Sequence, residues 1–321
     1  MSGMQTRNGK AFGYACLNAV YKTLSASQDV VIETTKQLET AHNLYTNAPN
    51  SLRSSLDEAA NAASRVVIRL EPQLSYPDGN SPLFLSLQSD AKGIAGDVRD
   101  LICIRNQNNW EIGLSCKHNH RAVKHSRLSS TIDFGRDWFG IPCTKDYFSE
   151  IAPIFEELRT TREQSNATAL WSDIVQKNER FYLPVLTAFM DEMHKLNNEH
   201  PNKIPELLIR YLIGQHDFYK VITNAGKRTT RIEGINLYGS LNRPSGGQRA
   251  LANVPKLQLP TRFYDIGLKP GSQTSIEVVC DRGWTISMRI HNASSRIEPS
   301  LKFDVNLVSL PVSIYAQDEP W

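Results

Sequence analysis

An aspartate, a serine and a lysine in two neighbouring runs of the sequence have the spacing of a hydrolytic site. Residues 97–105 and 110–117 are two strand-like runs separated by the polar stretch 106–109, a pattern typical of a β-hairpin. If Arg105 stands opposite Trp110, Asp100 faces Ser115 and lies close to Lys117. Because side chains alternate along a strand, we expect these three to emerge on one face near one end of the hairpin.

This combination suits metal-assisted hydrolysis of a phosphodiester. A carboxylate binds Mg²⁺ through oxygen, and the metal polarises the phosphate and lowers the pKa of a bound water. The lysine ammonium orients that water and stabilises charge at phosphorus. The predicted ligands are Asp100 and the backbone carbonyl of Cys116, with Asp97 as a further candidate if a bulge or an earlier strand start redirects it from the opposite face. Glu111 is a weaker catalytic candidate, because it lies roughly 13 Å along the strand from Ser115.

The opposite face of the hairpin is predicted to enter the core through Ile112, Leu114, Cys116, Leu101 and Cys103. Around it, helices are expected over about residues 9–70, interrupted near 47–50, and over 146–164, 170–196 and 204–213. Pro184 is expected to kink or divide the third of these. From about residue 232 to the C-terminus, β-branched and aromatic residues alternate with polar ones, which predicts β-strands, with turns at 269–271 and 281–283. The fold class predicted is α/β, a mixed central sheet flanked by helices, with a β-rich C-terminal portion.

Composition excludes several classes of protein. The 321 residues are 40% hydrophobic and 21% charged, an ordinary globular balance. No run approaches the ~20 apolar residues that span a bilayer, and the polar N-terminus does not resemble a secretion signal, so a cytoplasmic location is expected. The five cysteines are scattered without CxxC spacing, which predicts free buried thiols rather than disulfides or a zinc knuckle.

Positive charge is concentrated locally, although the net charge is only +3. Residues 117–136 hold five Lys or Arg and three His against one acid, and residues 227–249 hold five against one. Such stretches suit a groove that holds a polyanion, and equally suit solvated loops. A zinc site at Cys116, His118 and His120 would need an alternate-residue spacing that structural zinc sites rarely use. The letters HNH at 118–120 suggest another nuclease class, but the preceding strand favours the hairpin site.

Longer segments carry a family resemblance. GDVRDLICIR at 96–105 and WEIGLSCKHNHRAVKHSRLS at 110–129 resemble the HaeIII-type restriction endonucleases, which are similar to the PD-(D/E)xK nucleases. Further matches are DFG at 133, WF at 138, PIF at 153, YLP at 182, YLIGQHDFYK at 211, SLKFDV at 300 and the terminal Trp321. The resemblance therefore covers most of the chain. It implies a Mg²⁺-dependent type II enzyme that recognises GGCC in double-stranded DNA and cuts its centre to leave blunt ends.

The same resemblance implies partners for the protein and separate catalytic and DNA-recognition regions along the chain. A DNA methyltransferase is the expected functional partner, and the oligomeric state stays open, with a homodimer as one alternative. Residues 1–225 are expected to form a helical region plus the nuclease core, and 226–321 a β-rich DNA-recognition region, unless the two are one continuous domain. The residues predicted to contact DNA are His118, Asn119, His120, Arg121, Lys124, His125, Arg127, Arg228, Arg231, Asn236, Asn242 and Arg243. A later segment (Arg282, Arg289, His291, Arg296) is the alternative recognition element.

Two positions depart from the pattern. Ser115 stands where the acid of the acid-x-Lys trio is expected. Gly13 stands where related nucleases place a glutamate on the first helix, and glycine is also a poor helix residue. These departures keep a second hypothesis open, an impaired or non-catalytic DNA-binding protein of the same fold. A structural or scaffold protein is a third alternative, in which Asp100 and Lys117 meet by chance.

Overall fold

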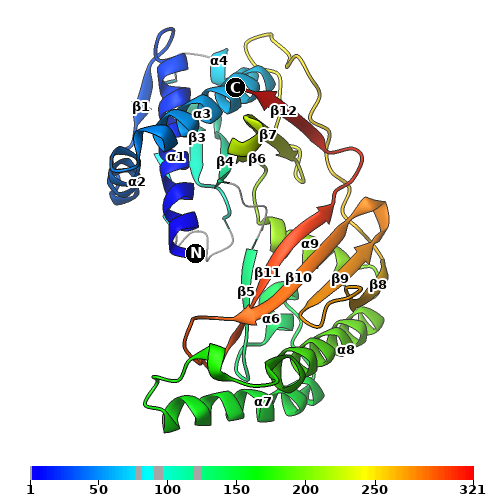
Figure 1. The fold of residues 1–321 in the computed structure, drawn as a ribbon. Helices are drawn as coiled ribbons and strands as arrows, with labels where there is room; N and C mark the ends of the chain where they lie inside the picture. Colours follow the sequence, from blue (N-terminus) through cyan, green and yellow to red (C-terminus); the bar gives the residue numbers. More distant parts are fainter. Residues whose placement is uncertain (1, 77–80, 90–96, 119–123) are drawn as a thin grey trace. The chain divides into compact units, whose positions relative to one another are not determined.

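The computed structural model describes residues 2–76, 81–89, 97–118 and 124–321 (Figure 1). The chain forms two compact units, each assembled from separate parts of the sequence. Unit 1 contains Met1–Arg121, Gly214–Leu257 and Ser313–Trp321, and unit 2 contains Ala122–Ile213 and Gln258–Val312. The expected division into 1–225 and 226–321 is therefore not the one observed. It would separate two strands that flank residue 225 and pair with each other in unit 1.

Unit 1 is built on a seven-stranded mixed sheet. Its strands, in spatial order, are β1 (Val30–Ile32), β2 (Leu83–Leu87), β3 (Leu101–Arg105), β4 (Trp110–His118), β6 (Phe218–Asn224), β7 (Thr229–Ile235) and β12 (Tyr315–Pro320). The pairs β1–β2 and β4–β6 are parallel, and the other neighbours are antiparallel. The prediction of a mixed sheet with helices is confirmed.

Helices α1 (Ser2–Leu24) and α3 (Asn50–Leu70) cover this sheet (Figure 1). α1 packs on β2, β3 and β4, while α3 packs on β6, β7 and β12. The apolar stripe of α3, which includes Leu56, Ala60 and Val67, is buried against the strands. α2 (Lys36–Thr46) begins where the Thr35 hydroxyl accepts the N–H of Leu38, and the short α4 (Pro72–Ser75) follows α3.

The helical region predicted over 9–70 is correct in substance and wrong in one detail. The interruption near 47–50 is present, because α2 ends at Thr46 and α3 begins at Asn50. The short strand β1 lies between α1 and α2 and was not predicted. Its three residues pair in parallel with β2 from Leu83 onward. A three-residue strand depends on that distant partner and leaves little periodicity in the sequence.

The hairpin between β3 and β4 has the predicted register. Arg105 pairs with Trp110, Ile104 with Glu111 and Ile102 with Gly113, and the 3-10 turn η1 (Asn106–Asn108) connects the strands. The predicted core layer is also confirmed, since its five members (Ile112, Leu114, Cys116, Leu101 and Cys103) all belong to the buried cluster beneath α1. β3 itself begins at Leu101, so residues 97–100 precede it.

Unit 2 contains a five-stranded antiparallel sheet and a set of helices. The strands, in spatial order, are β5 (Lys124–Leu128), β11 (Leu301–Ser309), β10 (Thr285–Asn292), β9 (Ser275–Cys280) and β8 (Phe263–Leu268). Its helices are α6 (Phe134–Phe139), α7 (Lys145–Gln164), α8 (Leu183–Glu199) and α9 (Ile204–Ile213). Three short helical segments also belong to unit 2: η2 (Trp171–Asp173), the π-helix η3 (Asn178–Tyr182) and η5 (Asp281–Gly283). In unit 1, the short 3-10 helix η4 (Ala225–Lys227) connects β6 and β7.

Aromatic side chains join the helices of unit 2 to its sheet. The Phe189 ring of α8 lies 5.1 Å from that of Phe303 in β11 and 4.7 Å from that of Phe134 in α6. Pro184 lies in the first turn of α8, directly after the π-helix η3, so the helical stretch predicted over 170–196 is divided beside this proline, as expected.

Two predictions from composition are also answered. All five cysteines are free and buried, as expected. Among the residues that the structure describes, no helix has both the length and the apolar character needed to cross a bilayer.

Candidate active site

Asp100 and Lys117 meet at the open end of the β3–β4 hairpin. The Lys117 Nζ lies 3.8 Å from the Asp100 Oδ2, and the two side chains are 27% and 43% exposed. The backbone holds the aspartate from both sides. Its N–H donates to the Leu114 carbonyl at 2.8 Å, and its own carbonyl accepts the N–H of Gln88 at 2.9 Å. The predicted approach of these two side chains is thus present in the structure.

Cys116 contributes through its backbone rather than its thiol. Its N–H donates to the Asp100 Oδ2 at 2.6 Å. In an extended strand the N–H and C=O of one residue point to the same side, so we expect the Cys116 carbonyl on the side of Asp100. A hydrogen bond with Cys16 and burial both raise the pKa of the Cys116 thiol, which keeps the sulfur neutral. An exposed carboxylate beside a backbone carbonyl is a donor set that fits Mg²⁺.

The donor set is small. In the described part of the chain, no three His, Cys, Asp or Glu side chains come close enough to hold a metal together. Ser115, at the position of the expected acid, is only 2% exposed and pairs with Lys220 of β6. Its hydroxyl is therefore not presented to solvent beside Asp100. Oxygen from water or substrate would have to complete the coordination of a cation here.

Gly13 of α1 lines the same hollow as Asp100, together with Gly9, Lys10 and Gln88. A Cβ atom placed on Gly13 would meet a single neighbour, the Leu87 Cδ2 at 4.0 Å. The position therefore has room for a side chain that points into the hollow. The structure thus places the two departures noted in the sequence, Ser115 and Gly13, in the immediate surroundings of Asp100.

Asp97 and Glu111 belong to a second cluster, organised by Arg99. The Arg99 Nε and Nη2 donate to the two carboxylate oxygens of Asp97 at 2.8 Å each, and Nη1 donates to the Glu111 Oε1 at 2.8 Å. Asp97 was expected on the face opposite Glu111, but both carboxylates line one hollow. The alternation of faces does not extend to residue 97, because β3 begins only at Leu101. Both carboxylate oxygens of Asp97 accept hydrogen bonds from Arg99, and Gln88 donates a further one. A metal ion at Asp97 would have to compete with these donors.

The residues that follow Lys117 are placed only in part. His118 ends β4, and burial lowers its pKa, so the imidazole is neutral at pH 7. Asn119, His120 and Arg121 lie outside the described residues. Lys124 and His125 begin β5, which belongs to unit 2, and the structure describes their backbone alone.

Three of the arginines predicted to contact DNA have acidic partners in the structure. In unit 2, Arg127 lies 3.3 Å from Glu298. In unit 1, Arg228 lies 2.6 Å from Glu58 and its guanidinium stands over the Trp321 ring, 5.3 Å from its centroid. Arg231 is bound by both Glu233 and Asp318. Contacts with phosphate would have to compete with these carboxylates.

The two asparagines of the expected recognition loop have structural roles. Asn236 is 3% exposed and donates to the Val254 carbonyl. The Asn242 amide donates to the carbonyls of Leu70 and Ala252. These amides hold the loop that follows β7. Arg243 donates to the Gly239 carbonyl and lines a hollow that also contains Glu111.

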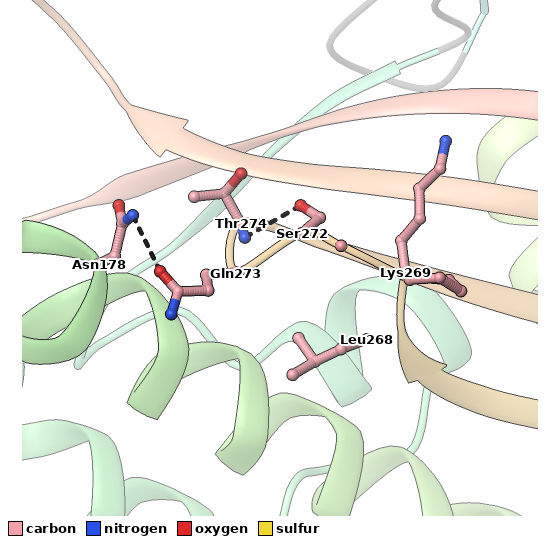
Figure 2. Close-up of a pocket in the computed structure, with 8 residues that line it drawn as sticks. Asn178, Leu268, Lys269, Ser272, Gln273 and Thr274 are labelled. Atoms are coloured by element: carbon pink, nitrogen blue, oxygen red, sulfur yellow. Dashed lines mark hydrogen bonds between the residues drawn. The ribbon is translucent and has the colours of Figure 1, made fainter.

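Unit 2 has a hollow of its own between the turn after β8 and the start of η3 (Figure 2). Asn178 donates to Gln273 at 3.3 Å, and the N–H of Thr274 donates to the Ser272 hydroxyl at 3.2 Å. Lys269 is the single ionisable residue of its lining. The lining residues that the structure describes include no carboxylate and no imidazole, in contrast to the end of the β3–β4 hairpin.

Sequence reasoning missed three residues near the hairpin: Arg99, Gln88 and His216. For Arg99, two signals were available: its place two residues after Asp97, and the glycine inside β4 at position 113. A glycine inside a strand often marks the close approach of another group. Gln88 and His216 left no such signal. They reach the cluster from β2 and from the entry to β6, which only the sheet brings beside β3 and β4.

Comparison with known proteins points in one direction. A family model described as "HaeIII restriction endonuclease" matches residues 9–311. A protein from Haemophilus aegyptius, named "Type II restriction enzyme HaeIII", is 38% identical over 321 residues, which are 100% of this chain and 99% of that protein. No solved structure matches the chain significantly.

Proposed function

Because this chain belongs to the HaeIII restriction endonuclease family, we propose that it recognises GGCC in double-stranded DNA and cuts the centre of the site to leave blunt ends. The protein is a type II restriction endonuclease, a hydrolase that acts on phosphodiester bonds. The extended resemblance between residues 96 and 129 supports the recognition sequence. We further propose a PD-(D/E)xK core for unit 1, supported by its mixed sheet and by the acid–lysine pair at the hairpin end.

The observation that carries the proposed site is the geometry of Asp100. Its carboxylate is held by the N–H of Cys116, is 43% exposed and has the Lys117 ammonium 3.8 Å away. We assign Asp100 and the Cys116 carbonyl to holding Mg²⁺, which when bound polarises the scissile phosphate and acidifies a water. Lys117 donates hydrogen bonds to the attacking water and offsets charge that develops on the phosphate oxygens. Asp100 keeps the ammonium in place by charge attraction.

Binding of DNA falls to the cationic side chains of both units. We keep Lys124, His125 and Arg127 as proposed contacts in unit 2, and His118, Arg228, Arg231 and Arg243 in unit 1. Neutral His118 can donate one hydrogen bond to a phosphate without adding charge. A DNA methyltransferase that protects the same sequence is the proposed functional partner, since an endonuclease of this type would otherwise cut the DNA of its own cell.

Plasmid digestion tests the proposal. Purified protein with Mg²⁺ should yield discrete blunt-ended fragments whose lengths match the GGCC positions of the plasmid. Lys117→Ala should abolish cleavage and leave binding of a GGCC duplex in Ca²⁺ within about threefold, because the lysine acts on the attacking water. Lys22→Ala, an exposed lysine near the end of α1, is the matched control and should cut normally. Near-normal turnover by Lys117→Ala would refute the assigned role of the lysine.

One observation favours a second candidate function, an impaired or non-catalytic DNA-binding protein. Around Asp100 the described residues supply one carboxylate, and the positions of the two expected acids hold Ser115 and Gly13. Such a protein would retard a GGCC duplex in a mobility assay and leave the plasmid intact in Mg²⁺ and in Mn²⁺. Discrete fragments in either metal would exclude it.

A further inference from the structure

Arg99 is a buried guanidinium that joins three segments of unit 1. Its side chain is 3% exposed. Two of its guanidinium nitrogens donate hydrogen bonds to the two carboxylate oxygens of Asp97, and the third donates to Glu111 near the start of β4. Asp97 also accepts from the Gln88 Nε2 at 2.7 Å, directly after β2. The cluster therefore ties the end of β2, the segment before β3 and the start of β4 to one another.

Gly113 provides the space for this arrangement. A Cβ atom at Gly113 would lie 2.1 Å from the Arg99 Cδ, 2.5 Å from Cγ and 2.8 Å from Cβ. The arginine side chain thus crosses β4 directly over the Gly113 backbone. Gly113 is in the interior of the sheet, paired with Ile102 on one side and Phe218 on the other. A strand interior disfavours glycine, so a close approach of this kind is a physical reason for its presence.

The charges of the cluster hold it rigid. Burial by itself would raise the pKa of Asp97, but hydrogen bonds from Arg99 and Gln88 lower it to about 2. The same bonds raise the pKa of Arg99 against the effect of burial. His216 faces both carboxylates, 3.5 Å from Glu111 and 3.9 Å from Asp97. Removal of one partner would leave a buried charge uncompensated, which disfavours any rearrangement.

Asp100 follows Arg99 directly and stands outside β3. Its place is set by two backbone hydrogen bonds and by the segment that precedes it. Arg99 anchors that segment to Glu111, at the opposite end of the strand that carries Lys117. We propose that Arg99 is a positioning residue for cleavage, with Asp97 and Glu111 as its counterions rather than metal ligands and Gly113 as the space it requires. The proposal rests on the function assigned to Asp100 and Lys117.

The first test is the rate of plasmid cleavage under single-turnover conditions. Gly113→Ala places a methyl group where the Arg99 side chain lies, and should slow cleavage at least tenfold while the dissociation constant for a GGCC duplex in Ca²⁺ stays within threefold. Gly267→Ala is the matched control: it is another strand glycine, and its Cβ would meet nothing closer than the Asp265 carboxylate at 3.5 Å. It should cut within twofold of the unaltered protein. A folded Gly113→Ala protein with an unchanged rate overturns the proposal.

Glu111→Gln separates a counterion from a metal ligand. The side chain is 42% exposed, so this variant keeps the test available if Gly113→Ala does not fold. If Glu111 is a counterion of Arg99, Glu111→Gln should slow cleavage several-fold. The Mg²⁺ concentration for half-maximal cleavage should then stay within threefold of that of the unaltered protein. A tenfold higher Mg²⁺ requirement would make Glu111 a ligand, and an unchanged rate would make it irrelevant; either result overturns the proposal.

Arg99→Lys and Arg99→Met complete the set. Lysine keeps the charge without the two-pronged geometry, so it should restore part of the rate that methionine loses. Equal rates for the two variants would argue against positioning by charge. Asp100→Asn reports separately on the proposed function: wild-type cleavage by that variant would refute the role of Asp100 itself. Discrete fragments that do not end at GGCC would refute the recognition sequence and leave the rate comparison intact.

Discussion

Asp97→Asn tests the cluster around Arg99 by stability alone, without reference to cleavage. The aspartate is 14% exposed, and its pKa is lowered from 3.8 to about 2. A carboxylate with a lowered pKa in the folded state contributes stability above its unfolded pKa and loses it as the pH falls toward the folded value. The shift corresponds to about 2 kcal/mol at pH 7, and to about 1 kcal/mol at pH 3, where both states are partly protonated.

The assay is thermal unfolding at pH 7, 5, 4 and 3. For a unit of this size, about 2 kcal/mol corresponds to a melting temperature roughly 4–8 °C lower for Asp97→Asn at pH 7. The difference from the unaltered protein should persist at pH 5 and shrink by about half at pH 3. Asp146→Asn is the control, because Asp146 is 77% exposed and pairs only at the surface with Lys195. A difference that does not change between pH 7 and pH 3 would refute the reasoning.

Two further predictions concern groups near the proposed site and in the core of unit 1. Gly13→Glu should lower the Mg²⁺ concentration for half-maximal cleavage by about tenfold, equivalent to about 1.4 kcal/mol, because it adds a carboxylate to the hollow that Asp100 lines. Gly13→Gln is the neutral control. An equal shift of the Mg²⁺ concentration for both variants would contradict the charge argument. Glu71 is fully buried, and burial raises its pKa to about 7 despite hydrogen bonds from Tyr219 and Asn242. A raised carboxyl pKa means that stability falls as the pH rises from about 4.5 to 7, by on the order of 3 kcal/mol, so Glu71→Gln should flatten the melting temperature between pH 5 and 8. An equally steep profile for Glu71→Gln would assign that dependence to other groups.

The β3–β4 hairpin shows how far local sequence can lead. Two strand-like runs and a four-residue polar break were enough to place Arg105 opposite Trp110, and the rest of the register followed because the side-chain period of a strand is two. The same alternation identified Cys103 and Leu114 as core residues. It also brought Asp100 next to Lys117, because that approach depends on a few residues of one hairpin.

The face expected for Asp97 differs from the observed one for a related reason, whereas its role as a metal ligand stays a prediction. Alternation was extended four residues beyond the point where β3 begins, and there the chain follows the contacts of Arg99 instead of a ladder. Those contacts involve Gln88, directly after β2, and Glu111 from the far end of the hairpin. A side chain at a strand entry takes its direction from such distant partners, and its own neighbours in sequence do not reveal them.

The sequence by itself determined the hairpin, its register, the pair Asp100 and Lys117, and the resemblance that covers most of the chain. Tertiary structure alone decided that the units are discontinuous, that Asn236 and Asn242 support a loop, and that Arg99 lies over Gly113. The physical reason is the range of the interactions. Periodicity and turn chemistry act over a few residues, whereas burial, ion pairing and close backbone approach join segments that meet only in the folded sheet.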